Sequence, residues 1–291
     1  MTRFILFGLI CLNSAFSNEK IQLYPALIKP LKQKEHRKES MVLRSPFFAH
    51  YKKNKKELIY IGAWHSNQSG GPTHLLIDKV LKKFRPEVAI GEIEPWRLFK
   101  LKTRKNICQR ICPESHYLFK TARQKGIKFE TGESSLDLLK KDFLKQGKNE
   151  RELIFLDVYR QVAHWSRRPP SQQERQLRTY IRRSKERYKV LNLEYTPQIF
   201  FADYKKTMKE NFHSELTSGQ DLAPYVDGHG INKLAHLYDI GREKGIIATL
   251  QRMLDIYDKV LIVYGSGHFH KHRKVLEKAF GQPKLYTHKR K

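Results

Sequence analysis

The chain has 291 residues, of which 40% are hydrophobic and 11% aromatic, and this content argues against a disordered protein. Lys and Arg number 57 against 29 Asp and Glu, so the formal net charge is +28. Such a charge favours anionic partners such as nucleic acid, anionic lipid or acidic glycan, although a uniformly basic surface without a special partner is the simpler interpretation.

The first seventeen residues are typical of a cleavable signal peptide. Arg3 supplies a positive charge, residues 4–12 form an apolar run, and Ala15 and Ser17 place small side chains at the −3 and −1 positions of a cleavage site. The apolar run has about half the length that a bilayer crossing requires. We therefore expect an exported protein, periplasmic or secreted, with no transmembrane span after cleavage; an uncleaved anchor is the alternative.

Residues 18–45 follow as a basic N-terminal arm, which we expect to be extended. The segment "PFFAHYKKNKKELIYIG" (46–62) then predicts two strands joined by a turn, a β-hairpin. The apolar spacing after Pro72 predicts a helix. The stretch "PEVAIGEIEP" predicts a short buried strand that begins at Val88 and is closed by Pro95.

A helix at "SHYLFKTARQKGI" and a strand at "KFETG" continue this alternation. Residues 135–215 predict a run of helices with no strand between them, which we interpret as an insertion on one side of the domain. The chain returns through a largely helical stretch to the strand "KVLIVYG", a final helix and a last strand at "PKLYTH". This pattern predicts a single α/β domain over residues 46–291, with a largely parallel or mixed core sheet and flanking helices.

Two cysteines, Cys108 and Cys112, remain once the leader is removed. A cysteine pair in an exported protein invites a disulfide, but an i,i+4 pair within one regular helix is poorly placed for that bond. Pro113 could begin a new helix and leave Cys108 in the preceding loop. The sequence leaves both outcomes open, and two thiols alone are a poor zinc site.

Three side chains with ligating or catalytic chemistry fall where predicted strands end. His65 and His268 each follow a strand in a Gly-x-x-His motif, and Glu92 ends the strand from Val88. Loops converge at the carboxyl ends of the strands in open α/β sheets, so we expect these side chains to share one crevice. The glycine of each motif would let the backbone turn steeply and approach a ligand closely.

Two imidazoles and one carboxylate can hold a divalent metal ion, for example Mn, Co or Zn, and leave a position for water. The ion would activate that water for hydrolysis. Without a metal, one histidine could act as general base while the glutamate orients it and the second histidine stabilises the oxyanion. Each motif alone arises easily by chance in a chain with 13 histidines and 16 glycines, so the prediction depends on their common position at strand ends.

The ordered set of motifs resembles the TraB/Tiki/erythromycin-esterase-like superfamily, whose members share two Gly-x-x-His motifs and a glutamate after the second strand. The stretch "PFFAHYKKNKKELIYIGAWH" is similar to the opening hairpin and first motif of that family. "VAIGEIEPWR" resembles the segment that carries its glutamate and arginine, which places Glu92 and Arg97 at those positions. "REKGIIATLQRMLDIYDKVLIVYGSGH" resembles the closing helix, strand and second motif, through Arg242 and His268.

The resemblance covers roughly residues 46–135 and 228–281, and it implies hydrolysis without fixing a substrate. Tiki-like members are metal-dependent proteases, erythromycin esterases cleave a lactone, and ChaN-like proteins bind haem. We therefore expect a metal-dependent hydrolase of peptide or ester bonds; a non-catalytic protein that binds haem or another small ligand in the same cleft is the alternative. Trp64 before the first histidine, and the high basicity, depart from the family pattern.

Five further residues support or surround the predicted site. Arg242 could neutralise Glu92 or a substrate carboxylate, and we count it with His65, Glu92 and His268 as catalytic. Glu133 follows the third parallel strand and is a fourth candidate metal ligand; a helix cap is its alternative role. We expect Glu94 to form a surface ion pair, and His270 and His272 to begin the last helix facing solvent.

The segment "RRPPSQQERQLRTYIRRSKERYK" suggests a different class of function. It is a basic helical stretch with interleaved Tyr180 and Tyr188, which is compatible with binding an anionic polymer. It contains no specific nucleic-acid motif, and a solvated helical face explains it as well.

Overall fold

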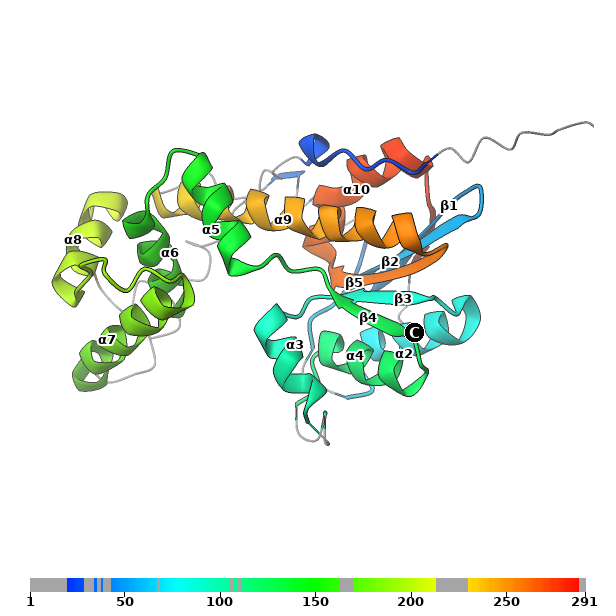
Figure 1. Cartoon of the computed structure of the whole chain (residues 1–291), viewed down its shortest axis with the longest axis horizontal. Coiled ribbons are helices and arrows are strands. Elements are labelled where there is room, and N and C mark those ends of the chain that lie inside the picture. The colour runs from blue at the N-terminus through cyan, green and yellow to red at the C-terminus, as the bar shows by residue number, and fades with distance from the viewer. Residues whose placement is uncertain are drawn as a thin grey trace, which may run out of the picture.

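The structure, a computed structural model, describes residues 20–28, 34–35, 38, 43–66, 69–104, 107–108, 111–162, 170–212 and 230–287. The predicted signal peptide, residues 1–17, lies outside them. Figure 1 shows an α/β fold in which helices cover both faces of one sheet, as the alternation of strands and helices predicts.

The strands of the sheet are β1 (Phe47–Lys53), β2 (Lys56–Ala63), β3 (Val88–Gly91), β4 (Lys128–Thr131), β5 (Lys259–Gly265) and β6 (Lys284–Thr287). Their order across the sheet is β4-β3-β5-β2-β1-β6. Neighbours from β4 to β2 are parallel, whereas β1 is antiparallel to both β2 and β6. The sheet is therefore mixed but mostly parallel, and β1 with β2 forms the predicted hairpin.

Two groups of helices accompany the sheet. Those that flank it are α2 (Pro72–Phe84), α3 (Pro95–Lys102), α4 (Glu114–Gln124), α9 (Gly230–Ile256) and α10 (Ser266–Phe280). The helical middle that the sequence predicts consists of α5 (Leu136–Lys145), α6 (Glu150–Val162), α7 (Pro170–Arg187) and α8 (Pro197–Met208). In Figure 1 this second group lies mostly to one side of the sheet, around the far end of α9.

Alternate residues of the central strands enter two different cores, because successive side chains of a strand point to opposite faces. Tyr60, Ile262 and their alternate neighbours pack with α9 and α10, and Ile61 and Val263 pack with α2 and α4. Burial on both faces explains why these strands are continuous apolar runs in the sequence. The parallel registers of β2 with β5 and of β3 with β5 bring the ends of these strands to one edge of the sheet.

The helical middle has a hydrophobic core of its own. Phe155, Tyr159, Phe200 and Tyr204 are buried there, together with Ile231 at the beginning of α9. The other end of α9 packs on the sheet through residues such as Ile247 and Leu254, so this 27-residue helix joins the two cores.

Two segments differ from the sequence-based expectation. Pro95 does not simply close a strand, because it is the first residue of α3, where a proline costs no hydrogen bond. The described part of the basic arm is anchored: Ile21 and Leu23 are buried, and Gln251 bonds the carbonyl of Ile21 at 2.8 Å and the amide of Leu23 at 2.6 Å.

Cys108 and Cys112 are joined by a disulfide in the loop before α4. Pro113 is the N-terminal cap residue of that helix, so the two cysteines do not share one regular helix. This arrangement is one of the two outcomes that the sequence leaves open. It places a covalent constraint directly before Glu114.

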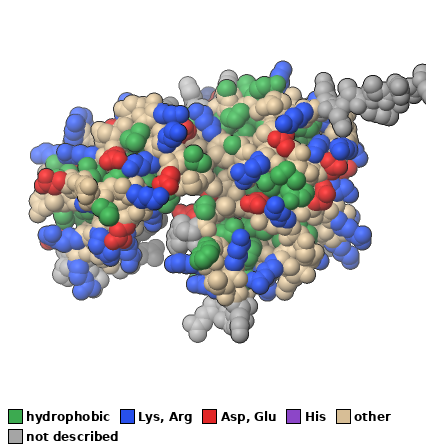
Figure 2. All heavy atoms as spheres, viewed as in Figure 1, with side chains coloured by type: hydrophobic (Ala, Val, Ile, Leu, Met, Phe, Trp, Pro, Cys, Tyr) green, Lys and Arg blue, Asp and Glu red, His purple; other side chains and the backbone are tan. Residues whose placement is uncertain are grey.

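On the face seen in Figure 2, basic side chains are spread out instead of forming one patch. Figure 2 shows Lys and Arg over both the sheet region and the helical middle, interspersed with hydrophobic and acidic side chains. Among the helices of the described residues, none combines the length and apolar content needed to span a bilayer.

Candidate functional site

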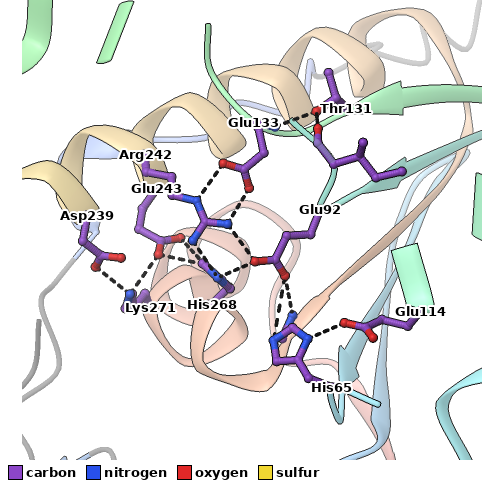
Figure 3. A network of polar contacts seen from close by, with 12 residues as sticks. His65, Glu92, Glu114, Thr131, Glu133, Asp239, Arg242, Glu243, His268 and Lys271 are labelled. Atoms are coloured by element: carbon purple, nitrogen blue, oxygen red, sulfur yellow. Dashed lines mark hydrogen bonds and ion pairs between the residues drawn. The ribbon is translucent and has the colours of Figure 1, made fainter. Parts of the chain in front are cut away.

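The predicted site residues meet at the carboxyl edge of the parallel strands. His65 follows β2, Glu92 follows β3, and His268 lies in the first turn of α10 after β5. Arg242 reaches the same place from the middle of α9, as Figure 3 shows. The strand ends therefore bring these side chains together, although the residues come from positions about 200 apart in the chain.

Glu92 lies between the two imidazoles and connects them. Its Oε2 atom is 4.0 Å from Nε2 of His65 and accepts a hydrogen bond of 3.3 Å from the amide of Gly265. Its Oε1 atom is 3.6 Å from Nε2 of His268 and 2.7 Å from the Arg242 guanidinium. Burial alone would raise the pKa of Glu92, but His268 and Arg242 hold it well below its ordinary value.

His65 stands on the open side of the site and is oriented by Glu114. Its Nδ1 atom contacts Oε1 of Glu114 directly, which leaves Nε2 directed toward Glu92. This hydrogen bond raises the pKa of His65. The backbone before His65 is held because the Thr73 hydroxyl accepts from the amide of Trp64 at 3.1 Å and donates to its carbonyl at 3.0 Å.

His268 stands on the closed side and is oriented by Glu243. Nδ1 of His268 lies 2.8 Å from Oε1 of this fully buried carboxylate, so its Nε2 also points toward Glu92. Burial alone would lower the pKa of His268, but Glu243 raises it to about 9. Each histidine thus has one nitrogen held by a carboxylate and the other facing Glu92, which is the usual arrangement of histidines that bind metals.

The interior beyond His268 is a buried polar network. Lys271 bonds Glu243 at 2.9 Å and Asp239 at 2.6 Å. His272 lies 2.8 Å from Glu243, and its Nδ1 is 3.1 Å from the Tyr60 hydroxyl. The expectation that His270 and His272 face solvent is therefore wrong: both are buried, because this side of α10 packs against the sheet.

Arg242 links Glu92 to Glu133, which follows β4, through ion pairs with both carboxylates. Its guanidinium bonds both oxygens of Glu133, at 2.6 and 2.7 Å, while also contacting Glu92 and lying 3.3 Å from Nε2 of His268. Glu133 thus belongs to the site, but both of its oxygens are paired with Arg242. Glu94 forms the expected ion pair, 2.8 Å from Arg97.

One set of side chains can hold a metal ion. Ligand atoms of His65, Glu92 and Glu114 lie within 4.8 Å of one another, and among the described residues no other group of three does so. His65 and Glu92 were expected in such a set; Glu114 was not, and His268 and Glu133 lie outside it. A cavity of about 280 Å³ opens beside these residues and is lined by His65, Glu92 and Glu114, with Ser66, Pro113 and Ser115.

The motif glycines are needed for space. Gly265 lies where β5 passes into α10 and has an ordinary backbone conformation, with φ −51° and ψ 143°, that other residues also adopt. A Cβ atom at Gly265 would overlap Nε2 of His65, and one at Gly62 would overlap the ring of Phe47. The glycine of the second motif therefore makes room for the histidine of the first.

Sequence reasoning missed two carboxylates of the site. Glu114 follows Pro113 in the first turn of α4, a position where an acidic residue is explained by the helix dipole alone. Glu243 is adjacent to Arg242 in a long helix, where an Arg-Glu pair suggests a solvated face. Only the fold reveals that both carboxylates orient histidines.

Comparison of the chain with models of known protein families, with curated proteins and with solved structures finds no match.

Proposed function

We propose that this protein is an exported, metal-dependent hydrolase that cleaves a peptide or ester bond at the edge formed by His65, Glu92 and Glu114. The observation that carries the proposal is the position of Glu92, with one oxygen toward each imidazole, beside an open cavity. The likeness of the ordered motifs to the TraB/Tiki/erythromycin-esterase-like superfamily supports the same chemistry.

The donor set of one imidazole and two carboxylates suits a divalent ion such as Zn, Mn or Co. When bound, such an ion supplies Lewis acidity and brings the pKa of water toward neutrality. The protein's own groups position the reactants. Glu114 fixes the ring of His65. Glu92 accepts hydrogen bonds from the Gly265 amide and from Arg242, which hold it between the two histidines.

His268 and Arg242 provide positive charge on the other side of Glu92. The Glu243 carboxylate keeps His268 protonated at neutral pH, since it raises the pKa of that histidine to about 9. Charges fixed in a partly buried site stabilise the negative charge that develops on a carbonyl oxygen during hydrolysis. We therefore assign His268 and Arg242 to oxyanion stabilisation; a protonated His268 is a poor general base.

Export is part of the proposal. The leader pattern of residues 1–17 supports it, and so does the Cys108–Cys112 disulfide, since disulfides persist mainly in oxidising compartments. Periplasm and extracellular space both satisfy these conditions.

Metal analysis of the mature protein, residues 18–291, tests the proposal together with hydrolysis of peptide and ester substrates. We expect bound divalent metal, hydrolysis that stops on chelation and returns with the ion, and loss of both in Glu92→Gln and His65→Ala. His268→Ala should retain metal, because His268 lies outside the group of three, but should hydrolyse slowly.

The matched control is His50→Gln, which removes a histidine of β1 that pairs with Glu57 away from the site. It should retain both metal and activity. Unchanged metal content in both Glu92→Gln and His65→Ala would remove the metal from the proposal, and hydrolysis that survives chelation would point to the imidazoles alone.

A further inference from the structure

A second cavity, of about 350 Å³, adjoins the first at Glu92. Glu92, Pro113 and Ser115 line both cavities, so the two meet at the carboxylate that we place at the centre of the reaction. A substrate with its scissile bond beside Glu92 could therefore extend into this second cavity, which we call the arginine cleft.

The carboxylates of the arginine cleft already have cationic partners. Glu94 pairs with Arg97 at 2.8 Å, and Glu133 and Glu92 both pair with Arg242. These acidic groups therefore offer little attraction to a cationic substrate.

Arg97, Arg160 and Arg242 line the arginine cleft. Of these, Arg160 has no described carboxylate within ion-pair distance. It comes from α6, and its guanidinium lies 5.3 Å from the centre of the Tyr238 ring, as in a cation–π contact. The Tyr238 hydroxyl is in turn 3.1 Å from that of Tyr188, which holds the ring in place. The Arg160 guanidinium is thus oriented at the cleft, and it has several N–H donors that a ligand could use.

The remaining lining of the arginine cleft is mixed, because Ser115, His116 and Ser134 contribute polar groups beside apolar ones. The apolar part comes from Ile93 in the β3–α3 connection and from Leu136 and Leu139 in α5. Apolar side chains close to the Arg160 guanidinium match a ligand that carries an apolar group next to a carboxylate.

We propose that the arginine cleft binds a carboxylate of the substrate through Arg160, so that the enzyme prefers peptides or esters with a free carboxylate close to the scissile bond. This proposal rests on the proposed hydrolase function. The carboxylate could be the C-terminus of a peptide or an acidic side chain, and both present the same two oxygens to the guanidinium.

Calorimetric titration of the metal-free mature protein tests binding without requiring catalysis. The probes are N-acetyl-phenylalanine and its amide, which differ only in the carboxylate. We expect the acid to bind about tenfold more tightly or better, because a hydrogen bond between charged groups is worth at least that ratio. Arg160→Gln should abolish this preference.

Arg175→Gln is the matched control, since Arg175 is an exposed arginine of α7 that does not line the arginine cleft. If Arg175→Gln still prefers the acid to the amide, the preference is not caused by general attraction of an anion to a protein of high positive charge. Equal binding of acid and amide by the unaltered protein would overturn the proposal. An acid preference that survives Arg160→Gln would do so as well.

Hydrolysis then separates this proposal from the function on which it rests. With peptide substrates, Arg160→Gln should raise KM for free acids and leave kcat within a few fold, and amidated peptides with or without an internal Glu distinguish the two sources of the carboxylate. Acid-selective binding without hydrolysis of any substrate would leave the arginine cleft intact and refute the hydrolase. Hydrolysis at the same rate with and without a substrate carboxylate would support the hydrolase and refute the proposal for the arginine cleft.

Discussion

Glu243 is fully buried and lies against three basic side chains, His268, Lys271 and His272, at 2.8 to 2.9 Å. Removing one member of such a buried network leaves its partners uncompensated, which costs about 3–5 kcal/mol. We therefore expect Glu243→Gln to lower the free energy of unfolding by about that amount in denaturant titration. Glu174→Gln, which breaks the exposed Glu174–Arg178 pair, should change it by about 0.5 kcal/mol or less.

The same carboxylate gives stability a pH dependence. Glu243 raises the pKa of His268 to about 9 in the folded protein, above the ordinary 6.5. Protonation of His268 therefore stabilises the fold fully below pH 6.5, and this contribution disappears as pH rises through 9. Its size is about 3 kcal/mol at most.

Urea titrations of the metal-free protein from pH 6 to 10 measure this contribution. We expect the difference in unfolding free energy between the unaltered protein and His268→Gln to shrink over that range. Glu243→Gln should lose most of this pH dependence, because only Glu92 then favours the protonated ring. A difference that stays constant with pH would show that His268 is neutral when folded.

At the scale of elements, the loop after β2 packs closely against the start of α10. His65 in that loop leaves no room for a side chain at Gly265, directly before α10. A methyl group at Gly265 would overlap Nε2 of His65. We expect Gly265→Ala to displace the exposed imidazole instead of unfolding the chain, and to lower metal affinity by at least about tenfold, as altered support of a ligand typically does.

Calorimetric titration with Zn²⁺, with circular dichroism as a check of folding, measures this effect. Gly241→Ala is the control, since a Cβ there would lie 3.3 Å from the Asp142 side chain, within a helix where alanine is favoured. Full metal affinity in Gly265→Ala would mean that His65 does not bind the ion from its present position.

The elements themselves were largely predictable, because β2, β3 and β5 are apolar on both faces and the helices show clear periodicity. The α3 helix was missed because Pro95 can either end one element or begin the next. Local sequence placed His65, Glu92 and His268 at strand ends, which suffices to bring them together in a parallel sheet. It could not place Glu114 or Glu243, because helix packing alone decides which of many acidic side chains turns inward.

At the scale of the whole molecule, α9 connects the sheet to the helical middle and carries Arg242 and Glu243 between them. Ile231 at one end belongs to the core of the helical middle, and Leu254 at the other belongs to the core over the sheet. Neither core can lose its part of α9 without exposing apolar surface. We therefore expect the two cores to unfold together.

Phe200→Ala tests this coupling from a position that does not contact the sheet core cluster. Phe200 is fully buried among Phe155 and Phe212, so truncation should cost about 3–5 kcal/mol. If unfolding is shared, hydrogen exchange should accelerate in β2 and β5 as much as in α6. Phe201→Ala, which truncates the partly exposed neighbour on the same helix, should have a much smaller effect. Faster exchange confined to α5–α8 would instead mean that the helical middle opens alone, with α9 and the site left in place.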